Sequence, residues 1–228
     1  MNNCHWGRSL PAFIFATIFL LSSAHANAQD ADAQQLARLK KGVVIVTTFD
    51  NHGTALMQGS GFFVDSGQVA TNFHVIRNAS QIRIETFDGT ISKVRIVLAT
   101  DEKNDLALMS VDAMAPHQTI LPMKIGAPAE GESVTVISNP QGSNWKVTRG
   151  ATGLLWELHG MGERLQITAS IAPGSSGGPV INSRGEVIAV ASMYFNSVSN
   201  LSFAVPVARL QALHARSHVQ ARVIEAGR

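Results

Sequence analysis

The segment "IAPGSSGGPVIN", from Ile171 to Asn182, places three glycines, two prolines and two serines between apolar residues. A cluster of this composition usually forms a turn between two strands. Glycines also let a loop approach closely and point its backbone amides at an anion, beside a serine hydroxyl. The rest of the chain must decide whether this loop only turns the chain or presents a nucleophile.

Length and charge restrict the class of protein. The chain has 228 residues, of which 45% are hydrophobic, enough for one sizeable domain or for two halves that share a core region. Lys and Arg number 18 against 16 Asp and Glu, for a net charge of +2. Because no broad basic field results, we expect no nucleic-acid partner.

Residues 1–28 have the pattern of a cleavable signal peptide. Arg8 supplies a positive charge, and the apolar run over 11–23 is too short to span a membrane. Small residues predict cleavage after Ala28, with Ala26 as an alternative site and an uncleaved anchor as the alternative interpretation. We therefore expect a periplasmic or secreted protein with no stable membrane anchor after cleavage.

Cysteine usage excludes several chemistries. Cys4 is the only cysteine and lies within the predicted signal peptide. The mature chain would then have no disulfide, no catalytic thiol and no cysteine-based zinc site. His214 and His218 have the i, i+4 spacing of metal ligands, but no third ligand is evident in the sequence. We predict no metal site and no cofactor.

The hydrophobic pattern predicts a mostly β chain. Helical composition over 30–41 is followed by about twelve short β-type runs, roughly six on each side of the proline-containing stretch Asp112 to Pro122. After the strands, Val207, Leu210, Leu213 and His214 fall along one stripe of a terminal helix. The predicted parts are a signal peptide over 1–28, an N-terminal helix over 29–41, β units over 42–115 and 116–207, and a helical tail over 208–228.

A serine nucleophile needs an imidazole to take its proton and a carboxylate to orient that imidazole. His74 directly follows the strand-like run "QVATNF" and precedes a predicted helical turn, where its side chain can face a cleft. Asp105 begins the apolar strand "DLALMSV", where a carboxylate is costly to bury unless something pairs with it. The alternatives are a core histidine and an aspartate that only caps a strand end.

The glycine-rich loop supplies the third component. With Ser176 as nucleophile, the backbone N–H groups of Gly174 and Ser176, with Ser175 between them, would form an oxyanion hole. Such donors meet the negative charge that develops on a carbonyl oxygen during acyl transfer. The candidate catalytic residues are therefore His74, Asp105 and Ser176.

Four segments together carry a family resemblance: "GSGFFVDSGQVATNFHVI", "NDLALMSV", "APGSSGGPVIN" and "NLSFAVPV". They resemble the signature segments of trypsin-like serine peptidases of the HtrA (DegP-like) group, over about residues 35 to 210. The resemblance implies two six-stranded antiparallel β-barrels with the active site between them. It also implies that His74 acts as general base and then acid, Asp105 orients it, and Ser176 forms an acyl-enzyme. Many relatives carry asparagine at the position of Ser175, which we expect to contribute mainly its backbone.

The same resemblance implies the substrate pocket. Ile171 would lie at its floor, and the segment from Ala191 to Phe195 would line its wall, including Ser192 and Met193. No acidic residue occurs at these positions, so we predict a small or medium aliphatic P1 residue. Ile171 and Phe195 are equally compatible with plain core positions. A glutamate-preferring pocket that uses His159 or Arg149 is a narrower alternative.

The resemblance therefore implies an exported serine endopeptidase, a hydrolase that cleaves unfolded or extended protein segments. Two departures from the family are apparent: no PDZ domain follows the peptidase segment, and there is no room for a long loop before "GSGFF". A homo-oligomer formed through the N-terminal segment is left open. The alternative function is a non-catalytic peptide-binding or chaperone-like module on the same fold.

Overall fold

The structure is a computed structural model that describes residues 30–111, 118–140, 145–195 and 201–226. The side chains of 193–195 and 218–226 are not described. The predicted signal peptide over 1–28 lies outside the described residues. A helix covers residues 30–40, and the compact unit considered below begins at Arg38.

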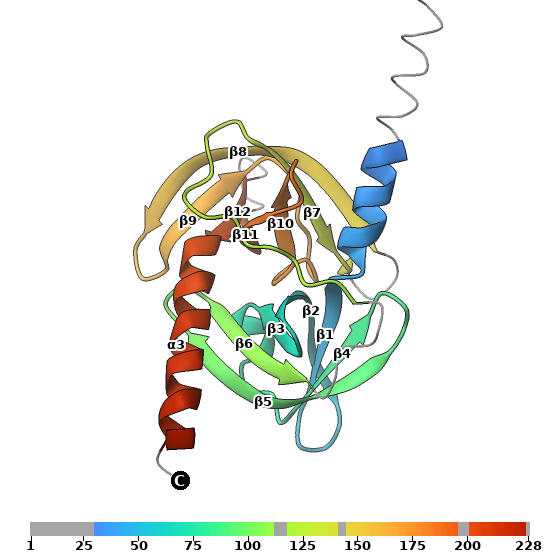
Figure 1. The fold of residues 1–228 in the computed structure, drawn as a ribbon, viewed down its shortest axis with the longest axis vertical. Helices are drawn as coiled ribbons and strands as arrows, with labels where there is room; N and C mark the ends of the chain where they lie inside the picture. Colours follow the sequence, from blue (N-terminus) through green and yellow to red (C-terminus); the bar gives the residue numbers. More distant parts are fainter. Residues whose placement is uncertain (1–29, 112–117, 141–144, 196–200, 227–228) are drawn as a thin grey trace, which may run out of the picture. The chain divides into compact units, whose positions relative to one another are not determined.

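The first half of this unit is a closed antiparallel barrel (Figure 1). Its strands follow one another around the barrel in the order β1-β2-β3-β6-β5-β4. Their bounds are β1 Val43–Phe49, β2 Ala55–Asp65, β3 Gln68–Thr71, β4 Gln81–Thr86, β5 Ile91–Asp101 and β6 Leu106–Val111.

Alternating apolar side chains explain this barrel. Val44 and Val46 of β1 are two residues apart, point to the same side and pack with Val69, Ile84 and Met109 in one core cluster. All five are at most 1% exposed. The β4–β5 connection contains the turn-type dipeptide Asp88-Gly89, in which Gly89 has a φ of +82° that glycine adopts without strain.

The second half forms another closed antiparallel barrel, with the strand order β10-β11-β12-β9-β8-β7. A core cluster inside it includes Val136, Leu165, Val180 and Ile188. The strand bounds are β7 Ser133–Ser138, β8 Lys146–Leu158, β9 Gly162–Ile167, β10 Pro179–Asn182, β11 Val187–Phe195 and β12 Leu201–Pro206. The prediction of two six-stranded antiparallel barrels is confirmed.

Several element boundaries differ from the hydrophobic pattern. The apolar run "GSGFFV" begins at Gly59, whereas β2 begins at Ala55, and β8 continues past the run "KVTRGATGLL" to Leu158. Both strands extend into exposed hairpins, where the hydrophobic pattern gives little guidance. Phe73 was expected to end a strand, but it begins the helical turn α2, Phe73–Ile76. Asn72 is the last extended residue, with φ −79° and ψ 149°.

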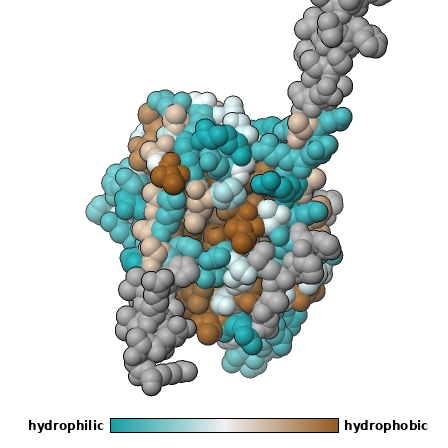
Figure 2. All heavy atoms as spheres, in the orientation of Figure 1, coloured by the Kyte–Doolittle hydropathy of each residue, from teal (hydrophilic) through white to brown (hydrophobic). Residues whose placement is uncertain are grey.

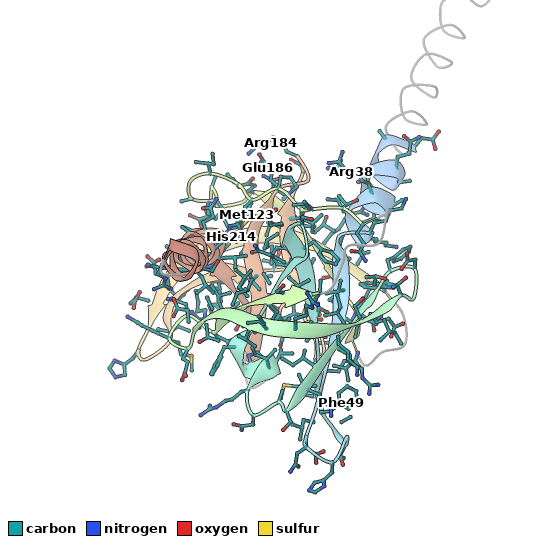
Figure 3. All side chains as sticks on the ribbon, turned by 60° about the horizontal axis from the view of Figure 1, so that its bottom comes forward. Arg38, Phe49, Met123, Arg184, Glu186 and His214 are labelled. Carbon is teal, nitrogen blue, oxygen red and sulfur yellow. The ribbon has the colours of Figure 1, made fainter. Side chains whose placement is uncertain are left out.

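The chain closes with helix α3, Val207–Ala226, seen nearly end-on in Figure 3. It packs on β5 and β6 of the first barrel and on β11 and β12 of the second. Val207, Leu210 and Leu213 are buried, as the helical stripe predicted, and His214 lies 3.9 Å from the Asp65 carboxylate. Among the described residues, we find no helix with the length and apolar character needed to cross a membrane.

Candidate active site

His74 lies on the short helical turn that follows β3, with its side chain 40% exposed. Its ring Nδ1 is 2.8 Å from Oδ2 and 3.0 Å from Oδ1 of Asp105. The backbone N–H of His74 also donates to Asp105 Oδ1, at 2.9 Å. An ionised carboxylate only accepts hydrogen bonds, so Nδ1 carries the ring proton. In the neutral ring, Nε2 is then left as a base.

Asp105 occupies a strained backbone position immediately before β6. Its φ of +57° lies in the left-handed region, which residues other than glycine seldom adopt, although aspartate does so more readily than most. Asn72 stabilises this conformation by donating from Nδ2 to the Asp105 carbonyl, at 2.9 Å. The strained backbone directs the carboxylate to His74, and residues held in this way are frequent at functional sites.

The segment quoted at the outset forms a tight turn that shapes the Ser176 loop. The Ser175 N–H donates to the Ala172 carbonyl at 2.8 Å, with Pro173 and Gly174 as the central residues. Gly174 has a φ of +91°, and proline followed by a positive-φ glycine is the type II turn pattern. Within the described part of the chain, the N–H groups of Gly174 and Ser176 donate to no protein acceptor. They are therefore available to bind an anion.

Ser175 contributes more than its backbone. Its side chain is buried, its hydroxyl lies 3.0 Å from that of Ser138, and its Oγ accepts a 3.2 Å hydrogen bond from the Ala172 N–H. We expected this position to contribute mainly its backbone, and the structure adds a hydroxyl that closes the loop from inside. A sequence cannot reveal this role, since Ser138 is 37 residues away.

Ser60 of β2 ties the loop to the first barrel. Its N–H donates to the Ser176 carbonyl at 2.8 Å, and its hydroxyl donates to the Gly174 carbonyl at 2.8 Å. The same hydroxyl accepts a hydrogen bond from the Asn139 N–H at 3.1 Å. Two segments that are distant in sequence therefore converge on one buried serine.

Close packing at Gly177 depends on the absence of a side chain. Its φ is +86°, and a Cβ there would collide with the Ser60 carbonyl and the Thr71 hydroxyl. Glycine is therefore required beside the nucleophile candidate, because any side chain at this position would clash with Ser60 and Thr71. Gly178 has no positive φ, but a Cβ on it would lie 2.8 Å from the Ile137 carbonyl.

Ser192 of β11 links the candidate residues of the two barrels. Its hydroxyl donates to Asp105 Oδ2 at 2.8 Å, and its carbonyl accepts a 3.1 Å hydrogen bond from the Ser176 hydroxyl. The structure thereby brings His74, Asp105 and Ser176 into one site. A lone serine in the apolar run "EVIAVASMY" was the available signal for this role, although the resemblance had suggested it only as part of a pocket wall.

The other predicted pocket residues lie nearby. Ile171 is 6% exposed and packs with Ala191 in the core cluster of the second barrel. Met193 and Phe195 belong to β11, but their side chains lie outside those described. His159 lies at the exposed tip of the β8–β9 hairpin, and Arg149 lies on β8 opposite Thr135 of β7. No cluster of three metal-ligating side chains occurs among the described residues.

A buried cation lies near the Asp105 carboxylate. Arg164 of β9 is 1% exposed, donates to the carbonyl of its neighbour Glu163, and leaves its Nε without a hydrogen-bond partner. Burial lowers the pKa of the Arg164 guanidinium, while the charges of Asp105, Asp101 and Glu157 oppose that shift. The site therefore combines a buried arginine with a carboxylate that accepts several hydrogen bonds.

The fold and this constellation define a trypsin-like serine peptidase domain. Residues 59–190, more than half of the chain, match the family model described as "Trypsin-like peptidase domain", and the chain belongs to this family.

The curated relatives are longer proteins. The chain is 33% identical over 168 residues to a "Probable periplasmic serine endoprotease DegP-like" of Pseudomonas putida, covering 69% of this chain and 34% of that protein. It is 29% identical over 177 residues to "Anti-sigma-I factor RsgI9" of Acetivibrio thermocellus, covering 76% of this chain and 24% of the relative. This chain thus spans about a quarter to a third of these relatives.

Among solved structures, the serine endoprotease from Yersinia pestis is similar, with a TM-score of 0.72 and 29% sequence identity. The match covers 81% of this chain and 65% of that one. The likeness confirms the two-barrel fold and the predicted resemblance to the HtrA group.

Proposed function

We propose that this protein is a serine endopeptidase in which Ser176 attacks the scissile carbonyl. The observation that carries the proposal is the Asp105 carboxylate, which binds His74 Nδ1 at 2.8 Å and the Ser192 hydroxyl at 2.8 Å beside the Ser176 loop. His74 takes the Ser176 proton through Nε2, and Asp105 stabilises the resulting imidazolium. The proton then passes to the leaving amine as the acyl-enzyme forms, and water resolves that ester.

The oxyanion hole follows from the turn geometry. The unpartnered N–H groups of Gly174 and Ser176 bind the oxygen that becomes negative in the tetrahedral intermediate. The Ser60 hydrogen bonds to the carbonyls of Gly174 and Ser176 keep the loop in register. In this role Ser60 supports the loop without touching the substrate.

Before reaction, the Ser176 hydroxyl donates to the Ser192 carbonyl. Attack therefore requires the Ser176 side chain to rotate so that its proton faces His74. This rotation breaks one hydrogen bond and moves the side chain between staggered rotamers.

The substrates that we propose are extended or unfolded protein segments in an exported compartment. Proteins related to this chain include one named as periplasmic, and the sequence over 1–28 has the signal-peptide pattern. The family resemblance assigns Ile171 and the segment from Ala191 to Phe195 to the P1 pocket, and because no acidic residue occurs there, we propose a preference for aliphatic P1 residues. Profiling of cleavage products from denatured casein tests this preference, and a majority of cuts after Arg, Lys or Glu would contradict it.

The central test is fluorophosphonate labelling of the purified protein beside Ser176→Ala and His74→Ala. Fluorophosphonates react only with a serine whose hydroxyl is activated, so we expect label on the wild type and on neither variant. Label retained on Ser176→Ala would eliminate this nucleophile. A well-folded wild type that takes no label would eliminate the peptidase activity.

A second candidate function is peptide binding without turnover. The observation that favours it is the similarity to a protein that is named as an anti-sigma factor. On this hypothesis, an extended peptide binds with equal affinity to the wild type and to Ser176→Ala, and neither cleaves it. Fluorescence anisotropy with a labelled casein peptide, followed by mass spectrometry of that peptide, separates the two functions.

A further inference from the structure

The turn that precedes Asp105 is held by a second aspartate. Asp101 accepts hydrogen bonds from the backbone N–H of Asn104, at 3.0 Å, and from its Nδ2, at 2.9 Å. The Asp105 N–H donates to the Glu102 carbonyl at 3.2 Å and completes the turn. The left-handed residue Asp105 therefore directly follows a turn that is closed by hydrogen bonds to the Asp101 carboxylate.

Helix α3 reaches this carboxylate from outside the barrel. The Arg216 guanidinium lies 3.2 Å from Asp101 Oδ2, the oxygen that also binds Asn104 Nδ2. Burial on its own raises the pKa of Asp101, but hydrogen bonds from Asn104 and Arg216 outweigh it and lower the pKa from its usual 3.8. The Asp101 side chain is only 16% exposed, so its charge is poorly solvated and depends on these partners.

The other sides of the turn are enclosed as well. Asn72 binds the Asp105 carbonyl, and the Asn104 side chain packs against Gly162 of the β8–β9 hairpin, where a Cβ would lie 2.8 Å from Asn104 Oδ1. A turn confined in this way transmits a small displacement at Asp101 directly to Asp105, four residues later. A displacement of 1 Å in a catalytic group is enough to lower a rate substantially.

We propose that Arg216 and Asp101 are positioning residues for Asp105, so that helix α3 supports the active site. The proposal rests on the proposed function, in which Asp105 orients His74. Without the guanidinium, the Asp101 carboxylate and its turn relax toward solvent, and the Asp105 carboxylate loses its alignment with His74 Nδ1. The effect should fall on kcat rather than on KM, because neither positioning residue lies among the predicted pocket residues.

The experiment compares Arg216→Gln, Arg216→Lys and Asp101→Asn with the matched control Arg209→Gln. Arg209 lies on the same helix and pairs with Glu163 at 2.6 Å, so the control removes the same charge from an ion pair that does not involve the turn. Because exposed ion pairs are weak, we expect kcat on casein to fall only about threefold to tenfold in Arg216→Gln and further in Asp101→Asn. Arg216→Lys should restore most of the rate, and Arg209→Gln should leave it unchanged.

A spectroscopic readout separates this proposal from the proposed function. The His74 Nδ1 proton shared with Asp105 should give a far-downfield proton NMR signal, whether or not Ser176 is reactive. We expect this signal to shift or broaden in Arg216→Gln and to persist in Arg209→Gln, with similar melting temperatures for the two variants. An unchanged signal in Arg216→Gln would overturn the positioning role. A shifted signal in a chain that takes no fluorophosphonate label would support positioning and reject the peptidase.

Discussion

The Ser192 hydroxyl donates a 2.8 Å hydrogen bond to Asp105, so a side chain of the second barrel binds the carboxylate of the first. The carbonyl of the same residue accepts from Ser176. Ser192 is therefore hydrogen-bonded both to the Asp105 carboxylate and to the nucleophile candidate Ser176. Its side chain and its backbone have separable roles, because substitution alters only the first.

Ser192→Ala should lower kcat about tenfold with little change in melting temperature. The substitution removes one hydrogen bond to a charged acceptor, which contributes roughly 1.5–3 kcal/mol at most, and part of that loss is recovered by water. Ser192→Thr keeps the hydroxyl and should retain most of the rate. Steady-state kinetics on casein check both variants, and equal rates for Ser192→Ala and wild type would refute the role.

Asp105→Asn should abolish activity while leaving the fold nearly intact. Asparagine accepts the left-handed φ of this position, but its amide lets Nδ1 of His74 become the acceptor, which places the ring proton on Nε2. In other triad enzymes the corresponding change costs about 10⁴ in kcat. We expect a loss of about 10³ or more in fluorophosphonate labelling rate.

Asp105→Ala is the contrasting variant for that prediction. Alanine adopts a positive φ less readily than asparagine, so it should lose stability of about 1 kcal/mol in addition to activity. Urea denaturation of both variants measures the difference. A more stable Asp105→Ala than Asp105→Asn would show that the backbone at this position is not strained.

Gly177→Ala should destabilise the protein far more than Gly89→Ala. Both glycines have φ above +80°, so the conformational cost of alanine, about 1 kcal/mol, is shared. Only at Gly177 does the added Cβ meet the Ser60 carbonyl and the Thr71 hydroxyl, while nothing lies within 4 Å of it at Gly89. We expect a loss of about 3 kcal/mol or more for Gly177→Ala, measured by urea denaturation. Equal losses in the two variants would contradict the packing argument.

Glu132→Gln should reduce stability near neutral pH and matter less in acid. Glu132 binds Lys124 at 2.8 Å and Asn182 at 3.1 Å, and it is 16% exposed. Burial on its own raises the pKa of Glu132, but these hydrogen bonds, with another from the Ala129 N–H, lower it from its usual 4.5. A lowered folded-state pKa stabilises the fold above pH 4.5, and that contribution is lost as the pH falls through the folded-state value.

The measurement is the free energy of unfolding from pH 7 to pH 3. Glu132→Gln should lose about 1 kcal/mol at pH 7, and the gap to wild type should close below about pH 4. Glu130→Gln is the control, because Glu130 is exposed on the same turn. The Glu132 network also reaches Arg184 and Glu186, which lie side by side at the β10–β11 turn (Figure 3). A constant gap at all pH values would contradict the charge-based account.

The strands and the candidate catalytic residues could be predicted from sequence because their signals are local. Alternating apolar residues mark each strand, and His74, Asp105 and Ser176 each stand in a short recognisable motif. The residues that hold the site together have no such signal. Ser60 meets Gly174 across 114 positions and Ser192 meets Asp105 across 87, so their partners exist only after the two barrels dock.

Exposed apolar residues are a second feature that sequence patterns did not reveal. Leu154, Leu155 and Trp156 of β8 are each more than 40% exposed, although all three are apolar. Figure 2 shows on one face of the molecule that hydrophobic residues reach the surface among hydrophilic ones. The hydrophobic pattern thus identified the strands, but it did not show which parts of a strand are buried and which are exposed to solvent.

The two barrels contribute different parts of the candidate site. His74 and Asp105 come with the first barrel, whereas Ser176 and Ser192 belong to the second. Chains generally fold from the amino-terminal side during synthesis, so the first barrel forms while the nucleophile candidate is still being made. The proposed site is therefore assembled only once the second barrel has folded, late in synthesis.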